Sequence, residues 1–263
     1  MENEFRAICY KNRHSPLPVF LVLFSVVCFA FAMFFDFGRL IDVITPDGMQ
    51  IGFFPAGSMV TQNVEKQLLS TVQSCNAIAW IAAIVLPSIC FRQDSESAAQ
   101  RMAIAHGQKK WVFELASYFS ETVFLQIWYF ALNVVLVVFL GAFQQQFLST
   151  AYLCQAVILW IQSALVLQGF FSLNRFVGMA FCSELALASF GFVEVVVGLV
   201  ISASCKINPS IFSKIILRAT PMPHWLALGA CNHQWGAVLS YAVFTIVIAE
   251  VGILLLVERR EMK

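Results

Sequence analysis

The chain is 263 residues long, and 60% of its residues are hydrophobic whereas only 12% are charged. Soluble proteins carry roughly 25% charged residues, so this composition excludes an ordinary water-soluble domain and is typical of a chain embedded in a lipid bilayer. The formal net charge of +1 gives no basis for a nucleic-acid partner.

Six apolar stretches are each long enough to cross a bilayer core of roughly 30 Å as a helix rising about 1.5 Å per residue. They are continuously apolar and lack the alternation of a membrane β-strand, so we expect an all-α membrane protein with a single transmembrane domain over residues 1–263. The predicted spans, in chain order, are Leu17–Phe35, Leu68–Phe91, Leu115–Leu140, Thr150–Phe171, Val177–Ser202 and Gly236–Val257.

The Lys and Arg residues between these stretches predict the orientation of the chain. With a cytoplasmic N-terminus, eleven of the 16 basic residues lie on the cytoplasmic side and five lie outside. This bias follows the positive-inside rule. Six spans then bring both termini to the cytoplasm, together with the connecting segment 92–114.

Residues 1–16 are too polar to span a membrane and predict a short helix in the membrane interface, with Phe5, Ile8 and Cys9 on one side. A basic start followed by an apolar stretch also suits a signal peptide. Leu17–Phe35 is long for the apolar part of such a peptide, however, and no small-residue cleavage site precedes Asp36. We therefore expect a retained anchor.

The outer segment 205–235 contains two apolar pieces, Ile211–Leu217 and Trp225–Ala230, that are too short to cross. Because Pro221 and Pro223 interrupt them, we expect re-entrant helices that dip into the outer leaflet before the last span. Two interpretations stay open, in which these helices either cap a transport pathway or seal the helix bundle.

Cys205 and Cys231 lie at the two ends of this outer segment. An exterior compartment permits a disulfide between them, but the spacing alone gives no geometry, so a bridged and a free pair both stay open. The sequence has no CxxC pair and no His/Cys cluster, so we predict no metal site.

Motifs for catalysis are missing from the sequence. Gly107 is followed by Gln108, Lys109 and Lys110 without the second glycine and hydroxyl residue that a phosphate-binding loop needs. The sequence also lacks a GxSxG turn and an HExxH helix. We therefore predict that the chain is not an enzyme and holds no cofactor of its own.

Four carboxylates fall inside the predicted spans, namely Glu121, Glu184, Glu194 and Glu250. Ionisable groups in a membrane usually face protein or water. Glu121, Glu184 and Glu250 are predicted about 10 Å from the cytoplasmic ends of their spans. These three are candidates for a pathway lining or a gate, and the alternative is that they are protonated or hydrogen-bonded and hold helices together.

Uncharged polar residues also recur on shared helix faces. Gln155 and Gln162 lie two turns apart on the fourth span, so both are expected to point into the protein. Interhelical hydrogen bonding explains this spacing without a substrate.

The cytoplasmic segment 92–114 has the pattern of a short separate helix. Asp94–Glu96 predict an N-cap and an acidic first turn, Ala98–Ala105 favours helix, and Gly107 predicts its end. The alternative is a solvated loop with one short helix.

Together with the interfacial N-terminus, six spans, outer insertion and basic tail ERREMK, this segment resembles the type-2 permease family of ABC transporters. The resemblance implies a coupling helix that seats in a groove of a separate ATPase subunit, which would carry ATP and Mg, and a second permease chain, identical or related. The sequence departs from the family at Ser97-Ala98, where glycine-threonine is frequent. The positions implied to contact the ATPase are Asp94, Ser95, Glu96, Ala98, Arg101 and Met102.

The stretch Pro221-Met222-Pro223-His224-Trp225 is similar to one in permease subunits that export, or give immunity to, lantibiotics and other peptide antibiotics. The similarity implies an exporter of an amphipathic substrate in a bacterial cell membrane. One alternative is a proton-coupled secondary transporter that uses the intramembrane carboxylates, although the two halves of the chain show no matched pair of broken spans. Another is a membrane-embedded enzyme or assembly scaffold.

Overall fold

The computed structural model describes residues 2–34, 78–95, 109–144, 150–181, 183–207 and 235–261. Nearly all of these residues are helical and none lies in a β-strand, so the predicted all-α architecture is confirmed for the described part of the chain. The helices are α1 (Glu2–Arg13), α2 (Leu17–Phe34), α5 (Trp80–Ser95), α7 (Lys110–Gln144), α8 (Thr150–Phe181), α9 (Glu184–Ile207) and α12 (Trp235–Glu261).

Among the described residues, α7, α8 and α12 are long and apolar enough to cross a membrane. Their apolar cores are Trp111–Phe139, Ala156–Phe181 and Trp235–Glu258. Shorter apolar helical stretches lie in the other three predicted spans, at Leu17–Ala30, Trp80–Cys90 and Leu185–Gly198. Helix therefore occurs in all six predicted regions, and three of these helices have the length expected of a membrane protein.

The boundary between the fourth and fifth predicted spans was wrong. Helix α8 continues through Phe181, ten residues beyond the predicted end at Phe171, and α9 begins only at Glu184. Asn174 and Arg175 lie in the predicted break between these two spans, but both point into the protein. Asn174 Nδ2 donates to the Phe170 carbonyl oxygen at 2.9 Å, and the Arg175 side chain is paired with carboxylates. The helix can continue here because the Arg175 guanidinium and the Asn174 Nδ2 group both find partners inside the protein.

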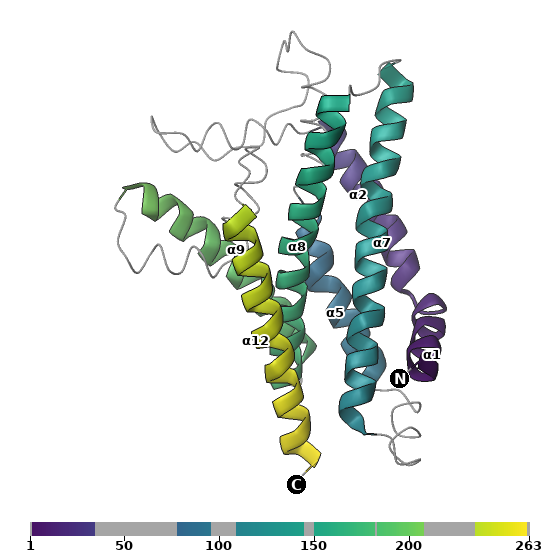
Figure 1. The fold of residues 1–263 in the computed structure, drawn as a ribbon, viewed down its shortest axis with the longest axis vertical. Coiled ribbons are helices and arrows are strands. Elements are labelled where there is room, and N and C mark those ends of the chain that lie inside the picture. The colour runs from purple at the N-terminus through teal and green to yellow at the C-terminus, as the bar shows by residue number, and fades with distance from the viewer. Residues whose placement is uncertain are drawn as a thin grey trace.

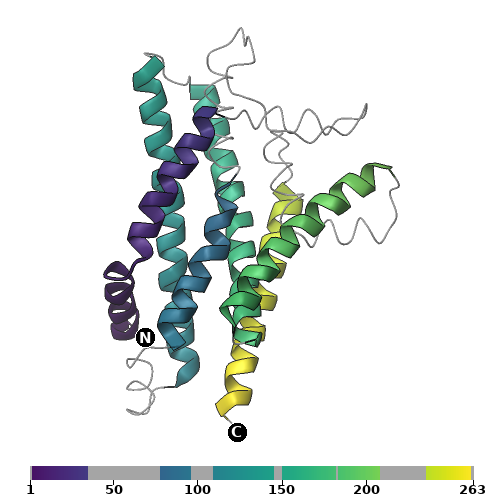
Figure 2. The ribbon, with the colours of Figure 1, turned by 180° about the vertical axis from the view of Figure 1, so that it is seen from behind.

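The chain passes up and down through the assembly, so that its two termini lie at the same end (Figure 1). Helix α8 is the central element, because 61% of an apolar stretch of 18 residues in it is buried, against 33% of the corresponding stretches in α7 and α12. Seen from behind, α2 and α5 lie across α7 and α8, while the far end of α9 leans away from the other helices (Figure 2).

Close packing joins α8 to α12, α5 and α9. Gly169 and Gly252 mark the contact with α12, because a Cβ atom on either residue would lie only 2.5 Å from Thr245 Oγ1 or from the Phe176 ring, respectively. Such small residues let helix backbones approach closely within a membrane. On the α5 side, the Trp80 ring packs edge-on against Phe170, with 6.5 Å between the ring centroids.

Helix α1 confirms the short helix predicted within residues 1–16 and packs against the beginning of α7. Ile8 is buried with Phe113 and Ala116. One turn further on, Asn12 Nδ2 donates to Ser120 Oγ at 3.0 Å. Helix α1 is therefore fixed to α7 by both apolar and polar contacts.

Candidate functional site

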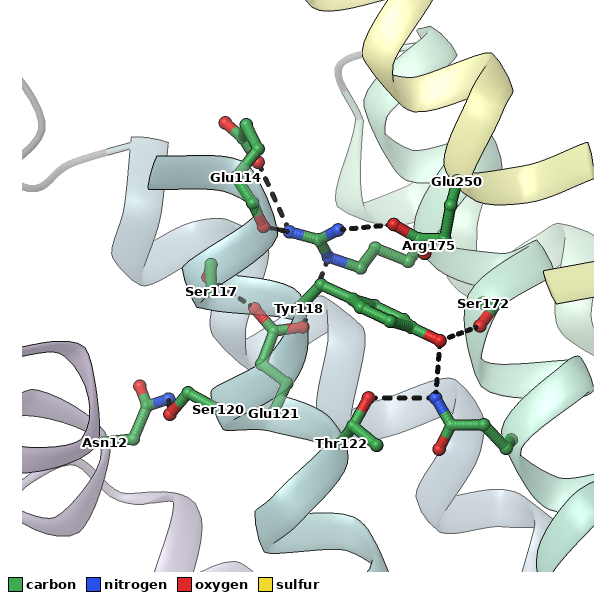
Figure 3. A network of polar contacts seen from close by, with 11 residues as sticks. Asn12, Glu114, Ser117, Tyr118, Ser120, Glu121, Thr122, Ser172, Arg175 and Glu250 are labelled. Carbon is green, nitrogen blue, oxygen red and sulfur yellow. Dashed lines mark hydrogen bonds and ion pairs between the residues drawn. The ribbon is translucent and has the colours of Figure 1, made fainter. Parts of the chain in front are cut away.

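Four charged residues, three of them buried and the fourth, Glu250, partly buried, lie together near the beginning of α7 (Figure 3), at the end of the assembly that carries both termini (Figure 1). Arg175 of α8 approaches Glu114 and Glu121 of α7 and Glu250 of α12. The guanidinium is 3.3 Å from Glu114 Oε2, 3.4 Å from Glu121 Oε2 and 3.9 Å from Glu250 Oε2. We call these four residues the Arg175 cluster.

The planar guanidinium suits this position because its donors point in fixed, divergent directions. Nη2 faces Glu114, where it also donates to the backbone carbonyl oxygen at 3.1 Å, Nε faces Glu121, and Nη1 faces Glu250. The Arg175 side chain is 8% exposed and that of Glu121 only 2%. Charges buried to this extent are tolerated only when they are paired.

Neighbouring side chains hold the cluster in place. The guanidinium carbon lies 5.6 Å from the centroid of the Tyr118 ring, a cation–π contact. Ser117 Oγ donates to Glu121 Oε1 at 2.7 Å, and the Tyr118 hydroxyl shares a 3.0 Å hydrogen bond with Ser172 Oγ. The orientation of the charged groups is therefore fixed from α7 and α8 together.

Hydrogen bonds continue from the cluster along the interface between α7 and α8. Gln168 Nε2 donates to the Tyr118 hydroxyl and to Thr122 Oγ1, both at 2.9 Å. Gln126 Nε2 donates to Gln168 Oε1 at 3.1 Å and to the Ala164 carbonyl oxygen at 3.2 Å. We call this set, Tyr118, Thr122, Gln126, Gln168 and Ser172, the polar strip.

The spacing along α7 explains the strip. Glu114, Tyr118, Thr122 and Gln126 are four residues apart, so they lie on one helix face and extend for about 18 Å. Helix α8 packs only sparsely against α7, in contrast to its packing against α12. Long polar side chains therefore make much of the connection between α7 and α8.

The structure brings together two of the three predicted gate candidates, Glu121 and Glu250. The third candidate, Glu184, is the first residue of α9, so the structure places it at a helix end rather than within the helix, and its role in a pathway or gate stays a prediction. Its side chain lies outside the described residues. The displacement follows from the extension of α8 into the region assigned to the fifth span.

Two further polar residues, Gln162 and Glu194, are buried but do not belong to the polar strip. Gln162 is completely buried, yet neither of its amide atoms has a hydrogen-bond partner among the described residues, so the interhelical bond expected for it is not seen within this part of the chain. Glu194 is 7% exposed and faces the interior from α9, and within the same described ranges its Oε2 also lacks a hydrogen-bond partner. The side chain of Gln155 lies outside the described part of the chain.

Of the predicted coupling residues, the structure describes only the first two, Asp94 and Ser95. Helix α5 continues through Asp94 and Ser95, so the backbone is helical where we expected the N-cap of a separate helix. Arg92 and Gln93 both favour helix, which accounts for the continuation. The other predicted contact positions lie outside the described residues, namely Glu96, Ala98, Arg101 and Met102.

The predicted outer features also lie largely outside the described residues. Cys205 belongs to α9, but its side chain is not described, and Cys231 is not described at all. The disulfide and the re-entrant helices within 208–234 therefore stay predictions.

Sequence reasoning missed Arg175, Glu114 and the polar strip. Arg175 is one of the eleven basic residues assigned to the cytoplasmic side, and Glu114 is the last residue of the predicted cytoplasmic segment 92–114. The signal that could have found them is the four-residue spacing from Glu114 to Gln126, which marks one polar face on an otherwise apolar helix.

Within the described ranges, the structure contains no group of three or more His, Cys, Asp or Glu residues arranged to hold a metal ion. Comparison with protein families, with curated proteins and with solved structures finds no match to this chain. Functional interpretation therefore depends on the geometry of the Arg175 cluster and on its place in the fold.

Proposed function

We propose that the chain is the permease subunit of an ATP-driven ABC exporter. In this proposal a second permease chain, identical or related, completes the pathway, and ATP and Mg bind to a separate ATPase subunit. The substrate is amphipathic, such as a lantibiotic or another antimicrobial peptide, and is expelled from a bacterial cell membrane.

The observation that carries the proposal is the position of the Arg175 cluster. The end of α5 and the beginning of α7, between which the predicted coupling segment falls in the sequence, lie at the end of the assembly that carries both termini. Helix α7 begins at Lys110, and Glu114 follows one turn later. Motion of this segment would therefore reach the cluster directly.

From the beginning of α7, the contacts offer a route to the other helices. Arg175 is held most closely by α7, through Glu114 and Glu121, while its 3.9 Å contact with Glu250 reaches α12. Because α7 and α8 share little close packing, a shift of α7 would mainly rearrange polar side chains. In the proposed mechanism, Arg175 transmits that shift to α8 and α12.

Co-purification with a nucleotide-binding subunit tests the proposal. Glu96→Lys and Met102→Trp are each expected to abolish co-purification, because both positions are predicted to face the ATPase. Glu258→Lys makes the same charge reversal at an exposed residue of α12 and should leave assembly intact. Unchanged assembly in the Glu96 and Met102 variants would contradict the coupling assignment.

A proton-coupled secondary transporter is the second candidate, and a specific observation favours it. Glu121 and Glu250, from different helices, meet at one guanidinium, an arrangement in which Arg175 could exchange carboxylate partners as a proton binds. This candidate predicts transport in vesicles that hold only this chain and a pH gradient. Transport that requires both an ATPase and ATP would exclude it.

A further inference from the structure

Helix α1 has two faces with different chemistry. Ile8 and Asn12 are each only 4% exposed and face α7, whereas Arg6, Tyr10 and Arg13 are exposed on the opposite side. Tyr10, whose side chain combines a large apolar ring with a polar hydroxyl group, is 68% exposed. The exposed face is therefore basic and aromatic.

The Tyr10 ring belongs to an ordered surface. His14 packs against it with 4.2 Å between the ring centroids, and His14 Nδ1 donates to the Tyr10 carbonyl oxygen at 2.8 Å. The exposed residues of α1 therefore hold a defined arrangement, which lowers the entropy lost when they bind a ligand.

The exposed surface changes abruptly where α1 gives way to α2. Val19, the third residue of α2, is 61% exposed, and the exposed residues that follow on this helix are also aliphatic. They include Val22, Leu23, Val26 and Val27. Aliphatic side chains of this kind are stable against lipid tails, so the surface suited to the hydrocarbon core begins between His14 and Val19.

The beginning of α7 repeats the same combination beside α1. Trp111 is 40% exposed, and Lys109, just before the helix, is also exposed. Aromatic residues with basic neighbours are typical of the level of lipid headgroups. Two separate segments thus present the same chemistry at this end of the assembly.

We propose that the exposed face of α1 binds the headgroups of anionic phospholipids. Arg6 and Arg13 contact the lipid phosphates, and the Tyr10 ring lies among the headgroups above the aliphatic surface of α2. Glu2 lies in register with this face, and the basic residues outnumber it. This lipid binding requires neither the ATPase nor the transported substrate of the proposed exporter.

Binding is expected to stabilise the folded chain, because α1 is fixed to α7 through Asn12 and Ser120. The test uses the purified full-length chain in a neutral detergent, with phosphatidylglycerol or phosphatidylcholine added. The unfolding temperature and the lipids retained in native mass spectrometry are measured. We expect phosphatidylglycerol to raise the unfolding temperature more than phosphatidylcholine, and high salt to reduce the difference.

The double variant R6Q/R13Q is expected to bind phosphatidylglycerol on the order of tenfold more weakly than the wild-type chain. Its matched control, R259Q/R260Q, removes the same charge from the end of α12 and should keep the response. Inorganic phosphate should not replace the lipid, because it offers no place for the Tyr10 ring.

Equal responses to the two lipids in the wild-type chain would overturn the proposal, even where the α1 variant fails to fold. An equal loss of response in both double variants would show general charge attraction and would also overturn it. A wild-type response in R6Q/R13Q would exclude α1 as the binding surface.

Discussion

At the scale of single residues, Arg175 is the side chain on which most of the buried charge depends. Ion pairs on a protein surface contribute about 0–1 kcal/mol, whereas removing one partner of a buried pair costs about 3–5 kcal/mol. Arg175, Glu114 and Glu121 are all buried, so the larger figure applies to them. Glu250 is more exposed, with a side-chain exposure of 15%, and its 3.9 Å contact is the longest in the cluster.

We therefore predict that Arg175→Gln lowers the free energy of unfolding by about 3–5 kcal/mol, because it leaves three carboxylates without their shared guanidinium. Arg175→Lys should lie between this variant and the wild-type chain, since a single ammonium group cannot point at three carboxylates in fixed directions. The measurement is denaturant unfolding of the purified chain in detergent. Adding Glu121→Gln to Arg175→Gln should recover part of the loss. Additive losses would argue against a direct pairing.

A second prediction concerns Gln168, whose amide group takes part in three hydrogen bonds of the polar strip. Hydrogen bonds between membrane helices contribute about 0.6 kcal/mol each, so Gln168→Leu should destabilise the chain by roughly 2 kcal/mol. A double-mutant cycle with Tyr118→Phe checks the assignment. A coupling energy near zero would show that the Gln168–Tyr118 bond contributes nothing to stability.

At the scale of helices, α8 and α12 are held together by close backbone approach rather than by charge. Gly169 faces both Thr245 and Tyr241, and a Cβ atom there would lie 2.5 Å from Thr245 Oγ1. A Cβ atom on Gly236, near the beginning of α12, would meet nothing within 4 Å. Substitutions at these two helical glycines therefore distinguish the effect of packing on stability from the effect of helix propensity.

We predict opposite effects of alanine at the two positions. Gly169→Ala should destabilise the chain by about 1–3 kcal/mol, because the added methyl group forces Thr245 or the helix to move. Gly236→Ala should be neutral or stabilising by up to about 1 kcal/mol, since alanine is the better helix former. Thermal unfolding of both variants under identical conditions gives the comparison. Equal effects would show that α8 and α12 do not rely on the contact at Gly169.

The accuracy of the sequence predictions differs between helices and sites for a physical reason. Continuous apolar composition predicted the helices, because a chain in lipid must satisfy its backbone internally. The end of α8 was misplaced because composition does not show that the Arg175 side chain is paired with α7 and α12. Glu121 and Glu250 were recognised as unusual charges, but their shared partner depends on tertiary contacts between distant segments.

At the scale of the whole molecule, several features of the described part of the chain lie at one end of the fold. The Arg175 cluster, the contact between α1 and α7, and both termini lie there (Figure 1). Moving along α7 toward its other end, the exposed side chains are apolar, including Ile127, Phe130, Val135 and Val138. The predicted orientation places the end that carries the cluster on the cytoplasmic side.

The predicted orientation of the chain in the membrane can be tested with inserted protease sites. A protease site inserted after Gly48, in the predicted outer segment between the first two spans, should be cut by protease added to intact cells. The same site appended after Lys263 should be cut only after the membrane is permeabilised, because the predicted six spans would place both termini inside. Immunoblotting of the fragments measures both results, and cleavage of both sites in permeabilised cells is the control. Cleavage after Lys263 in intact cells would place the Arg175 cluster near the outer surface, where no ATP-driven subunit can reach the segment between α5 and α7. That outcome would exclude the exporter while leaving the internal contacts of the cluster unchanged.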